Sequence, residues 1–219
     1  MTTATRASGD SHLPGRNRLR IWLGIFGVFW GLTIALLLHF RTNFHAVVDG
    51  LVYRSGQLDP LTLDSYIQSR HFQTIINLRG SGPQADWYKQ ERALARRHHL
   101  RYIDMPIDSI NPLRPEEVLL LLDVLKDKDA TPILIHCQSG IDRSGSMAVA
   151  LSLLLDNSRG LETARDQLQW NCGNLPWFRS TKNSRAYLDR YQQWLDRNGL
   201  DHSREHFCQW ALTVDKSHS

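Results

Sequence analysis

The segment 132–145, with the sequence PILIHCQSGIDRSG, constrains the fold more than any other part of this chain. Its apolar residues Ile133, Leu134 and Ile135 are typical of a buried strand, and the run that starts at Ser144 is typical of the beginning of a helix. A short polar loop connects the two. We therefore expect a strand, a tight loop and a helix N-terminus in direct succession.

The loop combines a cysteine, a glycine and an arginine in a spacing that suits anion chemistry. Cys137 lies where free backbone N–H groups and the helix dipole favour a thiolate. Arg143 adds a planar, two-pronged donor that matches phosphate oxygens, and Gly140 lets the backbone approach a ligand closely. These features predict nucleophilic attack on a phosphate ester. The predicted phosphate-binding residues are Gln138, Ser139, Gly140, Ile141, Asp142 and Arg143.

The segment HCQSGIDRSG resembles the signature of the cysteine-dependent tyrosine and dual-specificity phosphatases, HCxxGxxR followed by Ser or Thr. The resemblance implies that Cys137 forms a thiophosphate intermediate and that His136 orients the loop. Ser144 could help the sulfur to leave, and a helix N-cap is an alternative, compatible role for it. The segments VYRSGQL, TIINLRG and YIDMPI are similar to segments of atypical dual-specificity phosphatases of plants, fungi and bacteria, so the resemblance spans about residues 47–195.

Three aspartates are candidates for the general acid, which would protonate the departing alkoxide or phenoxide. We favour Asp108, which lies in the turn-rich segment PIDSINP, close to where the resembled family keeps its acid loop. Asp142 lies inside the loop beside Arg143, as in the myotubularin-like phosphatases, and Asp104 lies within the preceding strand. A further alternative is that no protein acid is used, which suits a good leaving group such as phosphate.

Composition narrows the remaining function classes. The 219 residues, 42% of them hydrophobic, suffice for one sizeable domain and an appendage. A net charge of +4 with scattered arginines does not indicate nucleic-acid binding, although it suits anionic substrates or an anionic membrane surface. Arg79 and, similarly, Arg54 could line the substrate cleft, but we favour their interpretation as structural or surface charges. No Cys/His spacing predicts a metal site, no cofactor is expected, and a bridge between Cys172 and Cys208 stays open.

Apolar patterning predicts the fold class. Expected strands alternate with helices over residues 44–200, which indicates an α/β domain with a central, mostly parallel sheet flanked by helices, as in dual-specificity phosphatases. An Asp49-Gly50 hairpin opens this phosphatase domain. Residues 201–219 form a C-terminal tail with a small apolar cluster around Phe207 and Trp210.

A second apolar feature precedes the domain. Residues 21–40 carry no formal charge and, at about 1.5 Å per residue, would cross the hydrocarbon core of a bilayer. We expect a mobile cytoplasmic tail at 1–19 and a transmembrane helix at 20–40, as in bacterial membrane-anchored phosphatases of the resembled family. The positive-inside rule then places the phosphatase domain in the periplasm, beyond an inner membrane. The basic residues are Arg6, Arg16, Arg18 and Arg20 before the span, against Arg41 and Arg54 after it.

The remaining hypotheses about function differ in the substrate. The signature most directly resembles tyrosine or dual-specificity protein phosphatases, so a phosphorylated protein is one expected partner. A phospholipid is the other, because a membrane anchor raises the local concentration of lipid phosphates. The alternative from a different class is a non-catalytic, membrane-tethered module that binds phosphate groups. The oligomeric state is not predicted.

Overall fold

The computed structural model describes residues 15–111 and 113–213, and for residues 15–19 and 35–41 it describes the backbone alone. The chain divides into two compact units, Met1–His39 and Phe40–Ser219. The first unit contains most of helix α1 (Gly15–Thr42), and all other elements belong to the second. The expected tail at 1–19 lies largely outside the described residues.

The transmembrane helix expected at 20–40 is not supported by the structure. Among the residues that are described, no helix is both long enough and apolar enough to cross a membrane. Residues 35–40 of the expected span lie outside the residues whose side chains are described.

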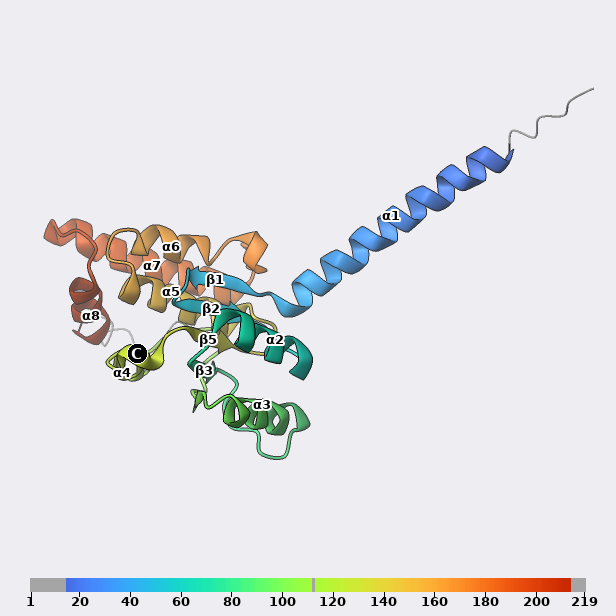
Figure 1. Cartoon of the computed structure of the whole chain (residues 1–219). Coiled ribbons are helices and arrows are strands. Elements are labelled where there is room, and N and C mark those ends of the chain that lie inside the picture. The colour runs from blue at the N-terminus through green and yellow to red at the C-terminus, as the bar shows by residue number, and fades with distance from the viewer. Residues whose placement is uncertain (1–14, 112, 214–219) are drawn as a thin grey trace, which may run out of the picture. The chain divides into compact units, whose positions relative to one another are not determined.

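A five-stranded sheet forms the centre of the second unit, in the order β1-β2-β5-β3-β4 (Figure 1). β1 and β2 are antiparallel, and all other neighbouring strands are parallel. The expected α/β class with a mostly parallel sheet is therefore confirmed. The strands are β1 (His45–Val48), β2 (Val52–Ser55), β3 (Thr74–Asn77), β4 (Arg101–Asp104) and β5 (Ile133–His136).

Helices cover both faces of the sheet. Since successive strand residues point to opposite faces, Ile133 and Ile135 pack in the large core cluster with α4, α5, α7 and α8, whereas Leu134 packs in a smaller cluster with α2 and α3. The helices are α2 (Pro60–Arg70), α3 (Asp86–Arg97), α4 (Pro115–Val124), α5 (Asp142–Leu155), α6 (Gly160–Asp166), α7 (Arg179–Asn198) and α8 (Arg204–Thr213).

Helix α8 occupies the region that the sequence indicated as a C-terminal tail. Its residues Phe207 and Trp210 are buried, and their rings pack against Tyr191 and Tyr187 of α7 at centroid distances of 5.3 and 4.8 Å. Edge contacts of this kind add to the burial of apolar area. Residues 204–213 are therefore part of the hydrophobic core of the second unit.

The parallel strands bring three chain segments together at one edge of the sheet. Ser55 at the end of β2 and Asn77 at the end of β3 are both in register with His136 at the end of β5. In open α/β sheets this carboxyl edge is where ligands bind. The residues that follow each strand, including Gln57, Arg79 and Cys137, therefore converge there.

Candidate active site

The loop 137–141 connects β5 to α5, as the sequence predicted, with helix α5 beginning at Asp142. Gly140 has a φ of +73°, and a Cβ atom at this position would lie 2.5 Å from the backbone nitrogen of Gly56. A side chain cannot occupy that space without shifting the backbone. Glycine is therefore required where the loop bends over the end of β2.

The carbonyl groups of the loop are bound by residues outside it. Gln138 O accepts the backbone N–H of Gln57 at 3.0 Å, and Gly140 O accepts the side chains of Asn43 and Arg54, each at 2.7 Å. The N–H of Gly140 donates to the Cys137 sulfur. With these carbonyls bound by other segments, the N–H of Gly140 is directed to the thiol, as expected of one donor in an anion-binding nest.

Cys137 is only 3% exposed, and two donors reach its sulfur. Sγ accepts the N–H of Gly140 at 3.2 Å and the hydroxyl of Ser144 at 3.1 Å. The Ser144 oxygen also lies 3.3 Å from Ser55 O, a second acceptor for its single proton. Donors to sulfur stabilise a thiolate, so Ser144 is placed to favour negative charge on Cys137.

Two arginines lie close together beside the loop. Arg143 Nη1 donates to Leu78 O at 3.2 Å, and Arg79 Nη1 donates to Gln57 Oε1 at 2.9 Å. Burial and then the charge of Arg143 lower the pKa of Arg79. The Arg79 guanidinium lies 3.7 Å from the centroid of the Trp87 ring, which fixes its position. Arg79, interpreted from the sequence as a structural or surface charge, is thus part of the site.

The favoured acid, Asp108, lies on an exposed loop. Its Oδ1 accepts the backbone N–H groups of Asn111 at 3.0 Å and Ile110 at 2.6 Å. These hydrogen bonds lower the pKa of Asp108 below its usual value. In this conformation the Asp108 carboxylate therefore binds its own loop, and its role as the general acid stays a prediction.

The other two candidate acids are held by structural contacts. Asp104 accepts hydrogen bonds from Asn77 Nδ2 at 2.8 Å and from the Tyr88 hydroxyl. Asp142 accepts the hydroxyl of Ser180, at the start of α7. Within the described part of the chain, none of the three aspartates hydrogen-bonds to the thiol or to Arg143. The structure therefore brings nucleophile, anion nest and arginine together, but not an acid.

His136 is buried against a carboxylate that the sequence did not single out. His136 Nε2 lies 2.8 Å from Glu91 Oε1, and Nδ1 lies 3.4 Å from Cys137 O. Glu91 also accepts the Tyr102 hydroxyl at 2.6 Å and Gln57 Nε2 at 2.5 Å. Burial alone would raise the pKa of Glu91, but His136 and these hydrogen bonds outweigh it and lower the pKa. Glu91 thus places a negative charge beneath the loop.

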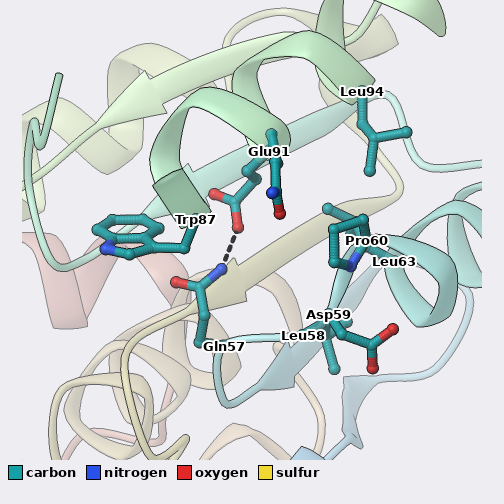
Figure 2. Close-up of a pocket in the computed structure, with 9 residues that line it drawn as sticks. Gln57, Leu58, Asp59, Pro60, Leu63, Trp87, Glu91 and Leu94 are labelled. Carbon is teal, nitrogen blue, oxygen red and sulfur yellow. Dashed lines mark hydrogen bonds between the residues drawn. The ribbon is translucent and has the colours of Figure 1, made fainter. Parts of the chain in front are cut away.

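A pocket of about 200 Å³ lies beside this carboxylate, between α2 and α3. Figure 2 shows the Gln57–Glu91 hydrogen bond at the pocket, with Trp87 on one side and Leu94 on the other. Gln57 connects this pocket to the loop through its backbone and to Arg79 through its side chain. The lining is mostly apolar and includes Leu58, Pro60, Leu63, Trp87 and Leu94.

Two further residues that support the loop were also missed as site residues. Arg54 is completely buried, and Nη2 donates to Ile141 O at 3.1 Å as well as to Gly140 O. Asn43, also buried, lies 3.5 Å from Ser139 O. An arginine in the otherwise apolar strand of VYRSG was a usable signal for Arg54, whereas nothing in the sequence marks Asn43.

The remaining cysteines and acidic residues do not extend the site. All three cysteines are free thiols, so a bridge between Cys172 and Cys208 is not formed. Burial raises the pKa of both these thiols. In the portion of the chain with described positions, no cluster of three or more His, Cys, Asp or Glu residues could hold a metal ion. Cys137, with its two donors, is the thiol suited to nucleophilic attack.

Comparisons with known proteins bear on the family and the fold of this chain. A family model described as "DSP-PTPase phosphatase fused to NAD+ Kinase" matches residues 43–185. The inositol diphosphatase DSP4 of Arabidopsis thaliana is 34% identical over 109 residues, 48% of this chain and 52% of that protein, so the chain spans about half the length of this curated relative.

Solved structures are similar in fold. P. aeruginosa TpbA in complex with pTyr has a TM-score of 0.50 at 17% identity, with 71% of this chain and 91% of that chain covered. A candidate phosphatase from Shewanella putrefaciens CN-32 has a TM-score of 0.50 at 18% identity, with 70% and 90% covered. At these identities the likeness concerns the fold alone.

Proposed function

The chain belongs to the family described as DSP-PTPase phosphatase fused to NAD+ kinase, and from this membership we propose that it hydrolyses phosphate esters through a thiophosphate intermediate on Cys137. The observation that carries the proposal is the pair of donors, Gly140 N–H and the Ser144 hydroxyl, that reach the Cys137 sulfur. A sulfur held in this way at a helix N-terminus is an activated nucleophile beside an anion-binding loop.

The reaction has two steps. In the first, the thiolate of Cys137 forms an S–P bond while the P–O bond to the leaving group breaks, and Arg143 with the loop N–H groups stabilises the phosphoryl oxygens. In the second, a water oxygen attacks the phosphorus and the S–P bond breaks. Ser144 then donates its hydrogen bond to the departing thiolate. The water contributes its hydroxyl to phosphate and releases one proton.

The activity is tested by comparing the wild type with Cys137→Ser on an aryl phosphate. We expect the variant to fall to the uncatalysed rate while it still binds phosphate. Equal release of phosphate by both proteins would refute the proposed enzymatic activity. If the wild type binds phosphate without hydrolysing the aryl phosphate, the alternative is favoured, a non-catalytic phosphate-binding module. Asp108→Asn and Asp142→Asn test which aspartate is the general acid. If the leaving group must receive a proton, loss of the acid should lower the rate of hydrolysis by about 10² to 10⁴.

A second candidate substrate class is a diphosphate, in which the leaving group is itself a phosphate. Such a group departs without a protein acid, and in this structure the Asp108 carboxylate accepts backbone N–H groups of its own loop. Arg79 and Arg143 lie close enough for their charges to interact, so a second phosphate would relieve their repulsion. The inositol diphosphatase relative is named for activity on a substrate of this kind.

The diphosphate candidate predicts a selective effect of Arg79. Arg79→Gln should lower kcat/KM by about tenfold or more on an inositol diphosphate, because one charged phosphate contact is lost. The same variant should change kcat/KM on an aryl phosphate by less than about threefold. Equal losses on both substrates would contradict a second phosphate subsite. Asp108→Asn serves as the control, since a diphosphate substrate should not respond to it.

Phosphorylated proteins and lipids remain candidates as substrates. The resemblance to tyrosine and dual-specificity phosphatases supports a phosphoprotein, whereas the apolar segment 21–40 supports a lipid phosphate presented in a bilayer. A panel of phosphopeptides, phospholipids in vesicles and inositol diphosphates, offered at equal phosphate concentration, ranks the classes by kcat/KM. A lipid preference should disappear when residues 1–40 are removed, because it depends on tethering.

The location proposed for the domain rests on the sequence alone. Segment 21–40 and the basic residues before it support an inner-membrane protein with a cytoplasmic N-terminus and a periplasmic phosphatase domain. A reporter that is active only in the periplasm, fused after Ser219, should be active. A silent periplasmic fusion together with an active cytoplasmic one would reverse this location.

A further inference from the structure

Arg54 is a guanidinium enclosed completely by the protein beneath the phosphate loop. Its side chain is 0% exposed and comes from β2, the strand that neighbours β5. Nη2 donates to Gly140 O at 2.7 Å and Ile141 O at 3.1 Å, and Nη1 donates to Gln167 O at 2.8 Å. Two of the carbonyls that shape the loop are therefore bound by one rigid group.

The contacts of Arg54 fix which way the loop peptides point. A peptide plane that directs its carbonyl to Arg54 directs the N–H of the next residue to the opposite side. The carbonyls of Gly140 and Ile141 belong to the peptides whose N–H groups are those of Ile141 and Asp142. Those N–H groups lie at the start of α5, where an anion would bind.

The charge of Arg54 also lacks a carboxylate partner. Among the residues with described positions, no Asp or Glu forms an ion pair with it, and its Nε has no hydrogen-bond partner. Burial lowers the pKa of Arg54, and the groups that act against this are Cys172, Cys137 and Asp142. A buried cation is costly unless a negative charge lies near it. The Cys137 thiolate is a negative charge that the proposed mechanism supplies.

We propose that Arg54 is a positioning residue that holds the phosphate loop in its anion-binding shape from beneath and stabilises the thiolate form of Cys137. The proposal rests on the proposed function, in which the loop binds a phosphoryl group. Arg143 and Arg79 act from the substrate side, whereas Arg54 acts from inside the core and never contacts substrate. Besides these arginines, the charged and titratable groups near the thiol are His136, paired with Glu91, and Asp142.

Two substitutions separate the charge of Arg54 from its shape. Arg54→Met removes both, and Arg54→Lys keeps a charge but not the two-pronged donor. The readouts are the rate of Cys137 alkylation by iodoacetamide as a function of pH, followed by mass spectrometry, and the affinity for inorganic phosphate. Arg185→Met is the control, because Arg185 also donates to a backbone carbonyl, that of Leu168, at 2.9 Å, and this carbonyl is not one of the loop 137–141.

The expected results differ between the variants. Arg54→Met should move the midpoint of alkylation upward by about one pH unit or more, which corresponds to a tenfold smaller ionisation constant of the Cys137 thiol. Arg54→Lys should move it by less than half as much but weaken phosphate binding by about tenfold. Arg185→Met should change neither. Circular dichroism establishes that each variant is folded.

Two results would overturn the proposal. One is a folded Arg54→Met protein with the alkylation midpoint and phosphate affinity of the wild type. If Arg54→Met does not fold, unchanged phosphate affinity in a folded Arg54→Lys protein decides against it. Neither readout requires turnover, so a chain without phosphatase activity that still shows both shifts would refute the proposed function while leaving the role of Arg54 intact.

Discussion

Replacing Glu91 by glutamine removes a buried negative charge while it keeps the size and shape of the side chain. The carboxylate is 4% exposed. Its Oε1 lies 2.8 Å from His136 Nε2 and accepts the Tyr102 hydroxyl at 2.6 Å, and its Oε2 accepts Gln57 Nε2 at 2.5 Å. The substitution therefore tests how strongly α3 is held to β5, the strand that ends at His136, directly before Cys137.

The size of the effect follows from these three contacts. The amide oxygen of a glutamine at position 91 can still accept from His136 and Tyr102, but without the charge that strengthens both bonds. Its NH₂ group would face the NH₂ group of Gln57, which cannot flip without losing Arg79. One charge-assisted hydrogen bond is worth about 1.5 to 3 kcal/mol, and breaking a buried pair completely costs about 3 to 5 kcal/mol. We expect a loss of about 2 to 4 kcal/mol in the free energy of unfolding at pH 7.

The loss should depend on pH in one direction. Because the pKa of Glu91 is lower in the folded chain than its ordinary value of 4.5, folding favours the ionised form. This stabilisation is complete above about pH 4.5 and disappears as the pH falls through the folded-state value. Urea unfolding of wild type and Glu91→Gln between pH 3 and 8 should therefore show a difference that closes in acid.

A matched control uses the exposed pair Arg159–Glu162, whose Nε–Oε2 distance is 3.0 Å. Glu162→Gln should change the free energy of unfolding by less than about 0.5 kcal/mol, as exposed pairs do. Equal stability of wild type and Glu91→Gln at pH 7, or a difference that widens in acid, would refute the reasoning about the buried carboxylate.

Three further substitutions probe the loop itself. Ser144→Ala should slow thiophosphate hydrolysis about 10- to 100-fold while Cys137 is still phosphorylated, so stopped-flow assays should show a burst followed by a slow phase. Gly140→Ala should lower the free energy of unfolding in urea by about 2 kcal/mol or more, because its Cβ would meet backbone atoms. Gly199→Ala is the control: its φ is +61° but the space around it is open, so only backbone strain should destabilise it, by about 1 kcal/mol. Asn43→Gly should weaken phosphate binding about tenfold by calorimetry, because the hydrogen bond to Gly140 O is lost.

The parts of the fold and site that lie close together in the sequence were predictable. The strand 133–136, the loop and the start of α5 follow one another directly, so turn chemistry and helix rules suffice. The Asp49-Gly50 turn and the alternation of strands and helices likewise gave the mostly parallel sheet. Each of these inferences depends on interactions within about a dozen residues.

The parts that the sequence did not reveal depend mainly on contacts between distant segments. Glu91 lies on a polar helix, where a glutamate ordinarily faces water, and only the packing of α3 beside β5 buries it against His136. Arg54 was interpreted as a structural or surface charge, because the sequence does not reveal that loop carbonyls lie above β2. Asp108 stays the predicted acid, and in this conformation its carboxylate accepts hydrogen bonds from its own loop. Tertiary contacts, not local propensity, decide these positions.

The charges around the loop also indicate how salt should act on ligand binding. Arg79 and Arg143 are partly accessible, whereas Arg54 is fully buried, and salt screens accessible charges far more than buried ones. The proposed mechanism holds the phosphate in the nest by backbone N–H groups, by Arg143 and, through the loop, by Arg54. Of these, only the contribution of Arg143 is open to screening by salt, so the affinity for this phosphate should fall modestly with ionic strength. A second phosphate on the substrate would depend on Arg79, and its contribution should be lost in high salt. The preference for a diphosphate over a monoester should therefore decrease as salt rises, and a preference that is independent of salt would place the second phosphate away from Arg79.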